Sequence, residues 1–209
     1  MASNNEKTPG EILLSNVRIA FPVLWTPKRV GADAKGEPRY SCAGLLTPDH
    51  PGREQLKALI QKVAKEKWKD KAATVLKQLV AADKVCLHDG DTKAEYDGFP
   101  GNFFISTSSK VRPLVIDRDR TPLSEEDGKP YSGCYVNLKL DVWAQDNKWG
   151  KRINAQLQGV QFVRDGEPFA GGGRPADVDE FAELEAVDES DEFGAAEESG
   201  EDDGFGDLL

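Results

Sequence analysis

The sequence is poor in cysteine and has no long apolar run. Its three cysteines, Cys42, Cys86 and Cys134, are an odd number and show no CxxC spacing, which argues against a disulfide framework. No apolar stretch follows Met1 as it would in a signal peptide, and no run of about 18 apolar residues could form a transmembrane helix. We therefore expect a soluble protein, made in a reducing cytoplasm, with no membrane partner.

Signatures of catalysis and of metal binding are also missing. The only histidines are His50 and His88, and no GxSxG, HExxH or Walker motif occurs. The cysteines and histidines are not spaced as zinc ligands. The acidic loop HDGDTKAEYDGFPG has Lys93 where an EF-hand needs Asp or Asn. We expect no cofactor, no metal and no enzymatic activity.

Charge is distributed very unevenly along the chain. Residues 176–209 hold 15 of the 37 acidic residues and none of the 27 basic ones, which leaves 22 acidic and 27 basic residues in residues 1–175. The body is therefore cationic and the tail strongly anionic. This asymmetry is typical of a domain that binds an anionic partner and carries an acidic interaction tail.

Apolar periodicity predicts a mainly β domain with a helical insertion. Val17, Ile19 and Phe21 alternate with polar or small residues, as do the apolar residues from Cys134 to Val142, which is the period of a half-buried strand. YSCAGLLT, FFISTSS and KRINAQLQGVQFV are also strands, the last with a bulge near Gly159. Residues 51–82 have helical spacing, with Asp49 as the expected N-cap.

These elements predict an α+β fold: a five-stranded, Greek-key-like barrel capped by a helix between strands 2 and 3. The predicted domain spans residues 12–170 and follows a flexible N-terminus, residues 1–11. A Gly-rich linker then leads into an acidic tail, residues 171–209, whose composition cannot bury a core and predicts disorder.

Six aromatic residues are candidates for stacking on unpaired bases. Trp149 lies in the turn DNKWGK between Lys148 and Lys151, and an indole in a turn is hard to bury. Stacking is worth about 1–3 kcal/mol per base and tolerates any base sequence. The alternative for Trp149 is that its indole folds back over the barrel. The alternative for Trp143 is that the helix covers the strand face that carries it. The set is Trp149, Trp143, Tyr40, Tyr96, Phe103 and Trp25.

Cations on loops around the barrel are candidates for contacts with a phosphate backbone. Binding through them would weaken steeply with salt, whereas the alternative for each residue is an ordinary solvated surface charge. The set is Lys28, Arg29, Lys35, Arg39, Lys110, Arg112, Lys139, Lys148, Lys151 and Arg152.

Four segments in this order resemble the single-stranded DNA-binding proteins of bacteriophages, with a layout similar to the helix-destabilising protein of short-tailed coliphages. They are YSCAGLLTPDHPGREQLKALIQKV, VRPLVIDRDRTPL, PYSGCYVNLKLDVWA and WGKRINAQLQGVQFVRDGEPFAGGG. The resemblance covers residues 12–175 and implies an OB-fold variant with its helix between the second and third strands. It also implies sequence-independent binding of single-stranded DNA in phage replication or recombination, in the cytoplasm of the infected bacterium.

The resemblance further implies that the tail contacts replication proteins, such as a polymerase, helicase or primase. Such tails often end in an aromatic residue, whereas this one ends in two leucines. We expect the acids to mimic DNA phosphates over the basic groove and the apolar tip to dock in a partner. The tail residues are Asp202, Asp203, Phe205, Asp207, Leu208 and Leu209. The sequence does not decide whether the protein forms a homodimer.

Two other functions also stay open on the sequence alone. A metal-dependent nuclease could use the loop aspartates Asp89, Asp91, Asp117, Asp119 and Asp141 around two metal ions. An adaptor protein would act through its acidic tail, with the body as a carrier. Alternatively, the tail only keeps the protein in solution.

Overall fold

The computed structural model of the protein describes residues 10–29 and 36–169. All of these residues belong to one compact unit, residues 1–175. Residues 1–9 of the predicted flexible N-terminus, the predicted phosphate ligand Lys35 and the predicted tail, residues 171–209, lie outside the described residues.

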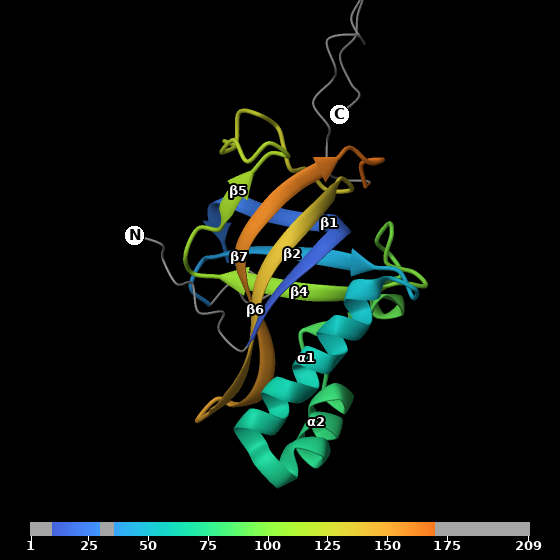
Figure 1. Cartoon of the computed structure of the whole chain (residues 1–209), viewed down its shortest axis with the longest axis vertical. Helices are drawn as coiled ribbons and strands as arrows, with labels where there is room; N and C mark the ends of the chain where they lie inside the picture. The colour runs from blue at the N-terminus through green and yellow to red at the C-terminus, as the bar shows by residue number, and fades with distance from the viewer. Residues whose placement is uncertain (1–9, 30–35, 170–209) are drawn as a thin grey trace, which may run out of the picture. The chain divides into compact units, whose positions relative to one another are not determined.

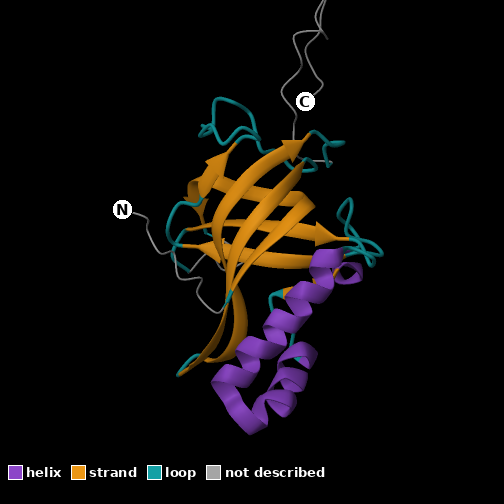
Figure 2. Ribbon diagram, viewed as in Figure 1, coloured by secondary structure: helices purple, strands orange, loops and turns teal. Residues whose placement is uncertain are grey.

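Five strands close into the predicted barrel (Figures 1 and 2). They are β1 (Glu11–Lys28), β2 (Arg39–Leu46), β4 (Phe103–Ser109), β6 (Tyr135–Asn147) and β7 (Gly150–Arg164). Antiparallel ladders join β4–β2–β1–β6–β7, and a parallel pairing of Ser108 with Gln156 closes β4 onto β7. The predicted OB-fold-like barrel is therefore confirmed. The sequence did not predict two short strands at its ends, β3 (Leu87–Asp89) and β5 (Leu114–Ile116).

The helical insertion lies between the second and third barrel strands, as predicted. It consists of α1 (Pro51–Trp68), a 3₁₀ turn (Lys69–Lys71) and α2 (Ala72–Ala81), and Lys69, with φ +50°, lies where α1 ends. The N-cap is His50 and not Asp49, because the His50 Nδ1 accepts a hydrogen bond from the Gly52 amide at 3.0 Å. Pro51, the first residue of the helix, has no amide hydrogen and therefore needs no capping partner.

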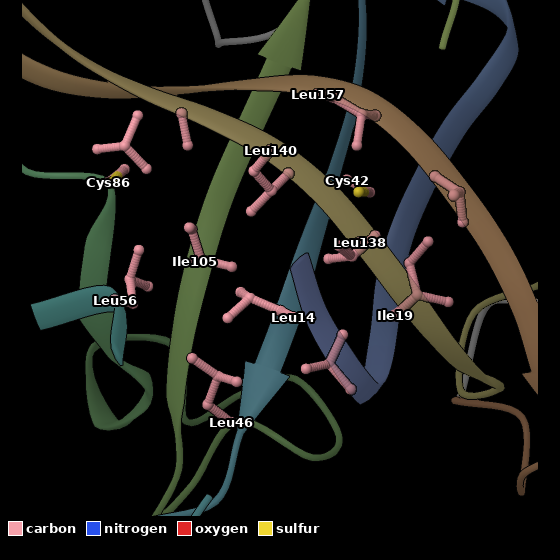
Figure 3. Close-up of a cluster of buried hydrophobic side chains, with 14 of the residues drawn as sticks. Leu14, Ile19, Cys42, Leu46, Leu56, Cys86, Ile105, Leu138, Leu140 and Leu157 are labelled. Atoms are coloured by element: carbon pink, nitrogen blue, oxygen red, sulfur yellow. The ribbon is translucent and has the colours of Figure 1, made fainter. Parts of the chain in front are cut away.

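The core fills the barrel and continues under α1 (Figure 3). On β6, Val136, Leu138, Leu140 and Val142 are buried while the residues between them are not, which confirms the predicted alternation. Leu56 of α1 is fully buried in the same cluster. Burial of each such side chain stabilises the fold by roughly 1.5–3 kcal/mol, so the barrel and the insertion form one cooperative core.

Strand β1 departs from its predicted alternation at Phe21. Ala20 is buried, while Phe21, expected to face inward, is 46 % exposed. The backbone explains the change, because Phe21 has φ +50° and the β1–β2 register shifts between Ala20 and Val23. A residue in this left-handed region interrupts the pleat. The predicted bulge near Gly159 is confirmed, since Gly159 and Leu157 pair with adjacent residues of β6.

Candidate nucleic-acid interface

A groove of about 750 Å³ crosses β4, β6 and β7 beside the start of β2. On β7, Arg152, Asn154 and Gln156 face it, and the residues between them contribute to the core. The period-2 pleat therefore forms a polar wall over an apolar core. Of the residues that the structure describes, thirteen line the groove: Arg39, Lys84, Ser108, Ser109, Lys110, Val111, Trp143, Gln145, Trp149, Arg152, Asn154, Ala155 and Gln156.

Two exposed tryptophans lie on one wall of this groove. Trp143 is outward-facing on β6 and 42 % exposed. Trp149 is 78 % exposed in the two-residue turn between Asn147 and Gly150, which are paired in register. The Asn147 side chain accepts a hydrogen bond from the Trp149 amide at 2.9 Å, and Gly150 has φ +103°. The indole that was predicted to lie in a turn therefore faces solvent. The positive φ of Gly150, which follows it, is a conformation that favours glycine.

The groove is cationic. Arg39, Lys84, Lys110 and Arg152 line it, and none of the described residues that line it is acidic. Lys110 also pairs with Glu37, and its hydrogen bond and charge lower the pKa of that carboxyl. The Lys148 ammonium lies 5.2 Å from the centroid of the Trp149 ring, within cation–π range. Positive charge beside exposed aromatic rings suits a flexible polyanion with exposed bases.

A second pocket of about 420 Å³ continues the groove toward β1. The two pockets share Arg39, Lys84, Ser108, Arg152, Asn154 and Ala155. Beyond this shared part, the second pocket is lined by Phe21, His88, Lys93, Phe104 and Ser106, among others. Tyr96, a predicted stacker, packs edge-on against Phe21 with centroids 5.0 Å apart and is 43 % exposed.

Four of the predicted stacking residues line neither pocket: Tyr96, which contacts Phe21, and three others that pack elsewhere. Trp25 is half-buried against the core, with the Arg112 guanidinium 5.2 Å from its ring. Phe103 is also half-buried, under the Arg53 guanidinium at 4.1 Å. Tyr40 is half-buried on β2, next to Arg39.

Several predicted phosphate ligands also lie outside the groove. Lys139 donates to Glu11 at 2.7 Å, and Lys151 pairs with Asp146. Lys28 and Arg29 are exposed at the end of β1. Arg39, Lys110 and Arg152 are the members of the predicted set that line it.

Sequence reasoning missed six polar residues of the groove, including Ser108 and Ser109 of β4. Asn154 and Gln156 could have been found from strand parity, because each lies between buried residues on β7, whereas Gln145 lies between half-buried Ala144 and exposed Asp146 on β6. Lys84 carries no such signal. It follows α2 in a turn, and the tertiary fold brings it to the groove, where its carbonyl accepts from the Ile153 amide at 3.0 Å.

The helical insertion supports the hairpin that carries Trp149 (Figure 1). The Trp68 Nε1 donates to the Asp146 Oδ2 at 2.8 Å, and the Lys151 ammonium lies 5.9 Å from the Trp68 ring. Lys151 and Trp68 together lower the pKa of Asp146. On the other side, Val85 forms a parallel bridge with Ile153. The hairpin is therefore held by a contact from the end of α1 and by a bridge from the segment that follows α2.

Three of the aspartates that a nuclease would need accept hydrogen bonds from backbone amides in loops. Asp89 accepts from the Asp91 amide at 3.0 Å, and Asp91 accepts from the Gly101 amide at 2.7 Å. Asp119 accepts from the Thr121 amide, which lowers the pKa of Asp119. Within the described ranges, no three His, Cys, Asp or Glu side chains gather as a metal site would require. Neither helix in this part of the chain combines the length and apolar character of a membrane span.

Sequence comparison connects the chain to phage proteins. The model of a family described as Enterobacter phage Enc34, ssDNA-binding protein, matches residues 10–193. Putative protein p50 of Acyrthosiphon pisum secondary endosymbiont phage 1 is 44 % identical over 184 residues, which cover 87 % of this chain and 97 % of p50.

Solved structures agree with this relationship. The single-stranded DNA-binding protein of bacteriophage Enc34, in complex with ssDNA, matches with a TM-score of 0.65 and 31 % identity, covering 80 % of this chain and 99 % of that one. The single-stranded DNA-binding protein gp2.5 of bacteriophage T7 matches with a TM-score of 0.51 and 14 % identity, covering 83 % and 98 %. This second likeness shows a shared fold.

Proposed function

The chain belongs to the family of the Enterobacter phage Enc34 ssDNA-binding protein, and we propose that it binds single-stranded DNA without regard to sequence and without catalysis. The observation that carries this proposal is the groove in which Trp143 and Trp149 stand beside four cations and no acid. The relative with a similar fold whose structure contains ssDNA supports the choice of ligand.

Binding combines stacking with phosphate neutralisation. Bases stack on Trp143 and Trp149, each contact contributing about 1–3 kcal/mol. The four groove cations, Arg39, Lys84, Lys110 and Arg152, contact phosphates. Duplex DNA binds more weakly, because its bases are already stacked on one another and cannot reach the indoles. Polar side chains along β7 contact sugars and base edges.

Salt weakens this binding in proportion to the phosphates neutralised. Each phosphate contact with a single strand contributes about −0.7 to the slope of log K against log salt. Four cations line the groove, so we expect a slope of about −3. Stacking does not release counterions, so a substantial affinity persists at high salt.

In the infected bacterial cell the protein covers single-stranded DNA during phage replication or recombination. Residues 12–170 bind the DNA, and the acidic tail, residues 171–209, recruits a polymerase, helicase or primase. Residues 176–209 hold 15 acids and no basic residue, which supports this division. Asp202, Asp203 and Asp207 steer the encounter, and Phe205, Leu208 and Leu209 dock in the partner. The same acids compete with DNA for the basic groove.

The test measures the anisotropy of a labelled oligothymidine titrated with the full chain, with matched duplex DNA as competitor. Trp149→Ala should weaken binding by about 5- to 150-fold, which corresponds to one stacked base. Val80→Ala is the control, since Val80 is exposed on α2 and does not line the groove. Equal competition by duplex DNA, or unchanged binding by Trp149→Ala, would contradict the proposal.

Two further measurements examine the tail and the absence of catalysis. Deletion of residues 176–209 should strengthen DNA binding and abolish capture of the replication partner, whereas for an adaptor it would abolish function without changing DNA affinity. Labelled single strands incubated with the protein and magnesium should stay intact, and specific cleavage would favour the nuclease.

A further inference from the structure

Phe21 is held in an unusual backbone conformation on the surface of the groove. Its φ is +50°, a region that β-strand residues with large side chains rarely adopt. The strand would bury this ring if its alternation continued, yet the ring is 46 % exposed and lines the second pocket. An exposed aromatic side chain on a strained backbone is a feature found at ligand sites.

Neighbouring rings hold Phe21 in place. The Tyr96 ring meets it edge-to-face with centroids 5.0 Å apart, and the buried Phe99 ring lies 5.7 Å away. Phe99 in turn contacts Phe104 at 5.1 Å. These contacts restrict the Phe21 side chain before any ligand arrives, so ordering it costs little on binding.

A cationic side chain and two hydrogen-bonding side chains, Lys93, His88 and Ser106, line the same pocket. The Lys93 ammonium is 5.0 Å from the Phe104 ring, and the His88 ring stacks on Phe104 at 4.8 Å. The His88 Nδ1 lies 2.6 Å from the Asp83 Oδ1, and its Nε2 lies 2.9 Å from the Ser106 Oγ. Because a carboxylate only accepts, Nδ1 carries the hydrogen that it donates to Asp83.

From this geometry we propose that Phe21 is the platform of a second base-stacking subsite, separate from the one at Trp143 and Trp149. The inference rests on the proposed binding of single-stranded DNA. The shared stretch of groove, with Arg39, Lys84 and Arg152, carries the phosphates between the two subsites. Lys93 faces the phosphate of the base on Phe21. A strand must span both subsites to bind with full affinity.

Oligothymidines from about 4 to about 16 nucleotides, the range of site sizes of OB folds, test this proposal with the full chain. Phe21→Ala should weaken binding of the longer strands by about 5- to 150-fold and leave the shortest unchanged, because short strands bind at the tryptophans. Phe21→Tyr keeps the ring and should bind like the parent. Leu13→Ala is the matched control, since Leu13 is an exposed apolar residue of the same strand that lines neither pocket.

The outcomes separate this inference from the proposed function. Parental affinity of Phe21→Ala at every length would overturn the second subsite, as would an equal loss at all lengths accompanied by a lower melting temperature. If Trp149→Ala also left every length unchanged, the proposed function itself would fail. A length-dependent loss in Phe21→Ala, with Phe21→Tyr and Leu13→Ala at parental affinity, supports the subsite.

Discussion

Trp68 provides the sharpest test of how the helical insertion contributes to the interface. It ends α1, is 8 % exposed, and donates its indole hydrogen to Asp146 at 2.8 Å. Asp146 pairs in register with Lys151, and the two residues flank the turn that carries Trp149. A single side chain therefore joins the helical core to the hairpin that carries the exposed indole.

Two substitutions separate the packing of Trp68 from its hydrogen bond. Trp68→Ala leaves a cavity in the core and should lower the free energy of unfolding by about 3–5 kcal/mol. Trp68→Phe keeps most of the ring and loses mainly the N–H donor, so it should cost about 1–2 kcal/mol. We expect Trp68→Phe also to weaken binding of single-stranded DNA, because the turn then samples orientations in which Trp149 does not face the groove.

Urea unfolding followed by circular dichroism measures stability, and oligothymidine anisotropy measures binding under conditions where every variant is folded. Trp25→Phe is the matched control, because it makes the same change at a tryptophan that lines neither pocket, and it should bind like the parent. The reasoning is refuted if Trp68→Phe binds with parental affinity while Trp149→Ala does not, or if Trp68→Ala unfolds at the parental urea concentration.

Two further predictions concern groups whose pKa the fold changes. Burial raises the pKa of the Cys42, Cys86 and Cys134 thiols to about 12. None of them should therefore react with iodoacetamide at pH 8 until the protein unfolds. If mass spectrometry finds a label on any of the three in the native protein, this prediction is wrong. Burial and, next, the charge of Glu11 raise the pKa of Asp141. A carboxyl with a raised pKa destabilises the fold above that pKa, so Asp141→Asn should raise the melting temperature at pH 7 and have no effect below about pH 3.9. An equal gain at both pH values would show that charge is not the cause.

Strand periodicity was a reliable guide where the backbone stayed regular. Alternation on β6 predicted which side chains enter the core, because the pleat sends successive side chains to opposite faces. The same rule was wrong at Phe21, where a left-handed residue and a register shift reverse the faces. A backbone change of this kind depends on pairing with β2 and on the aromatic rings packed against Phe21, so one strand's composition does not reveal it.

The candidate site divides in a similar way. Trp149 could be predicted because a turn that ends in glycine exposes its side chain wherever the hairpin lies. Trp25, Phe103 and Lys139 were equally plausible as DNA contacts when each was considered alone. In the structure Trp25 lies beside Arg112, Phe103 beside Arg53, and Lys139 pairs with Glu11. Such partners come from distant segments, and composition does not identify them.

The sequence alone determined the elements of this protein and its opposed charges, because periodicity, turn chemistry and charge runs are local properties. It therefore predicted the five barrel strands, the insertion, the exposed turn tryptophan and the strongly acidic tail. Tertiary structure alone decided that Arg39, Lys84, Trp143 and Arg152 share one groove, and that Phe21 faces its extension. The reason is that barrel closure brings β2, β4, β6 and β7 together and sets their register, and these are properties of paired strands rather than of any single segment.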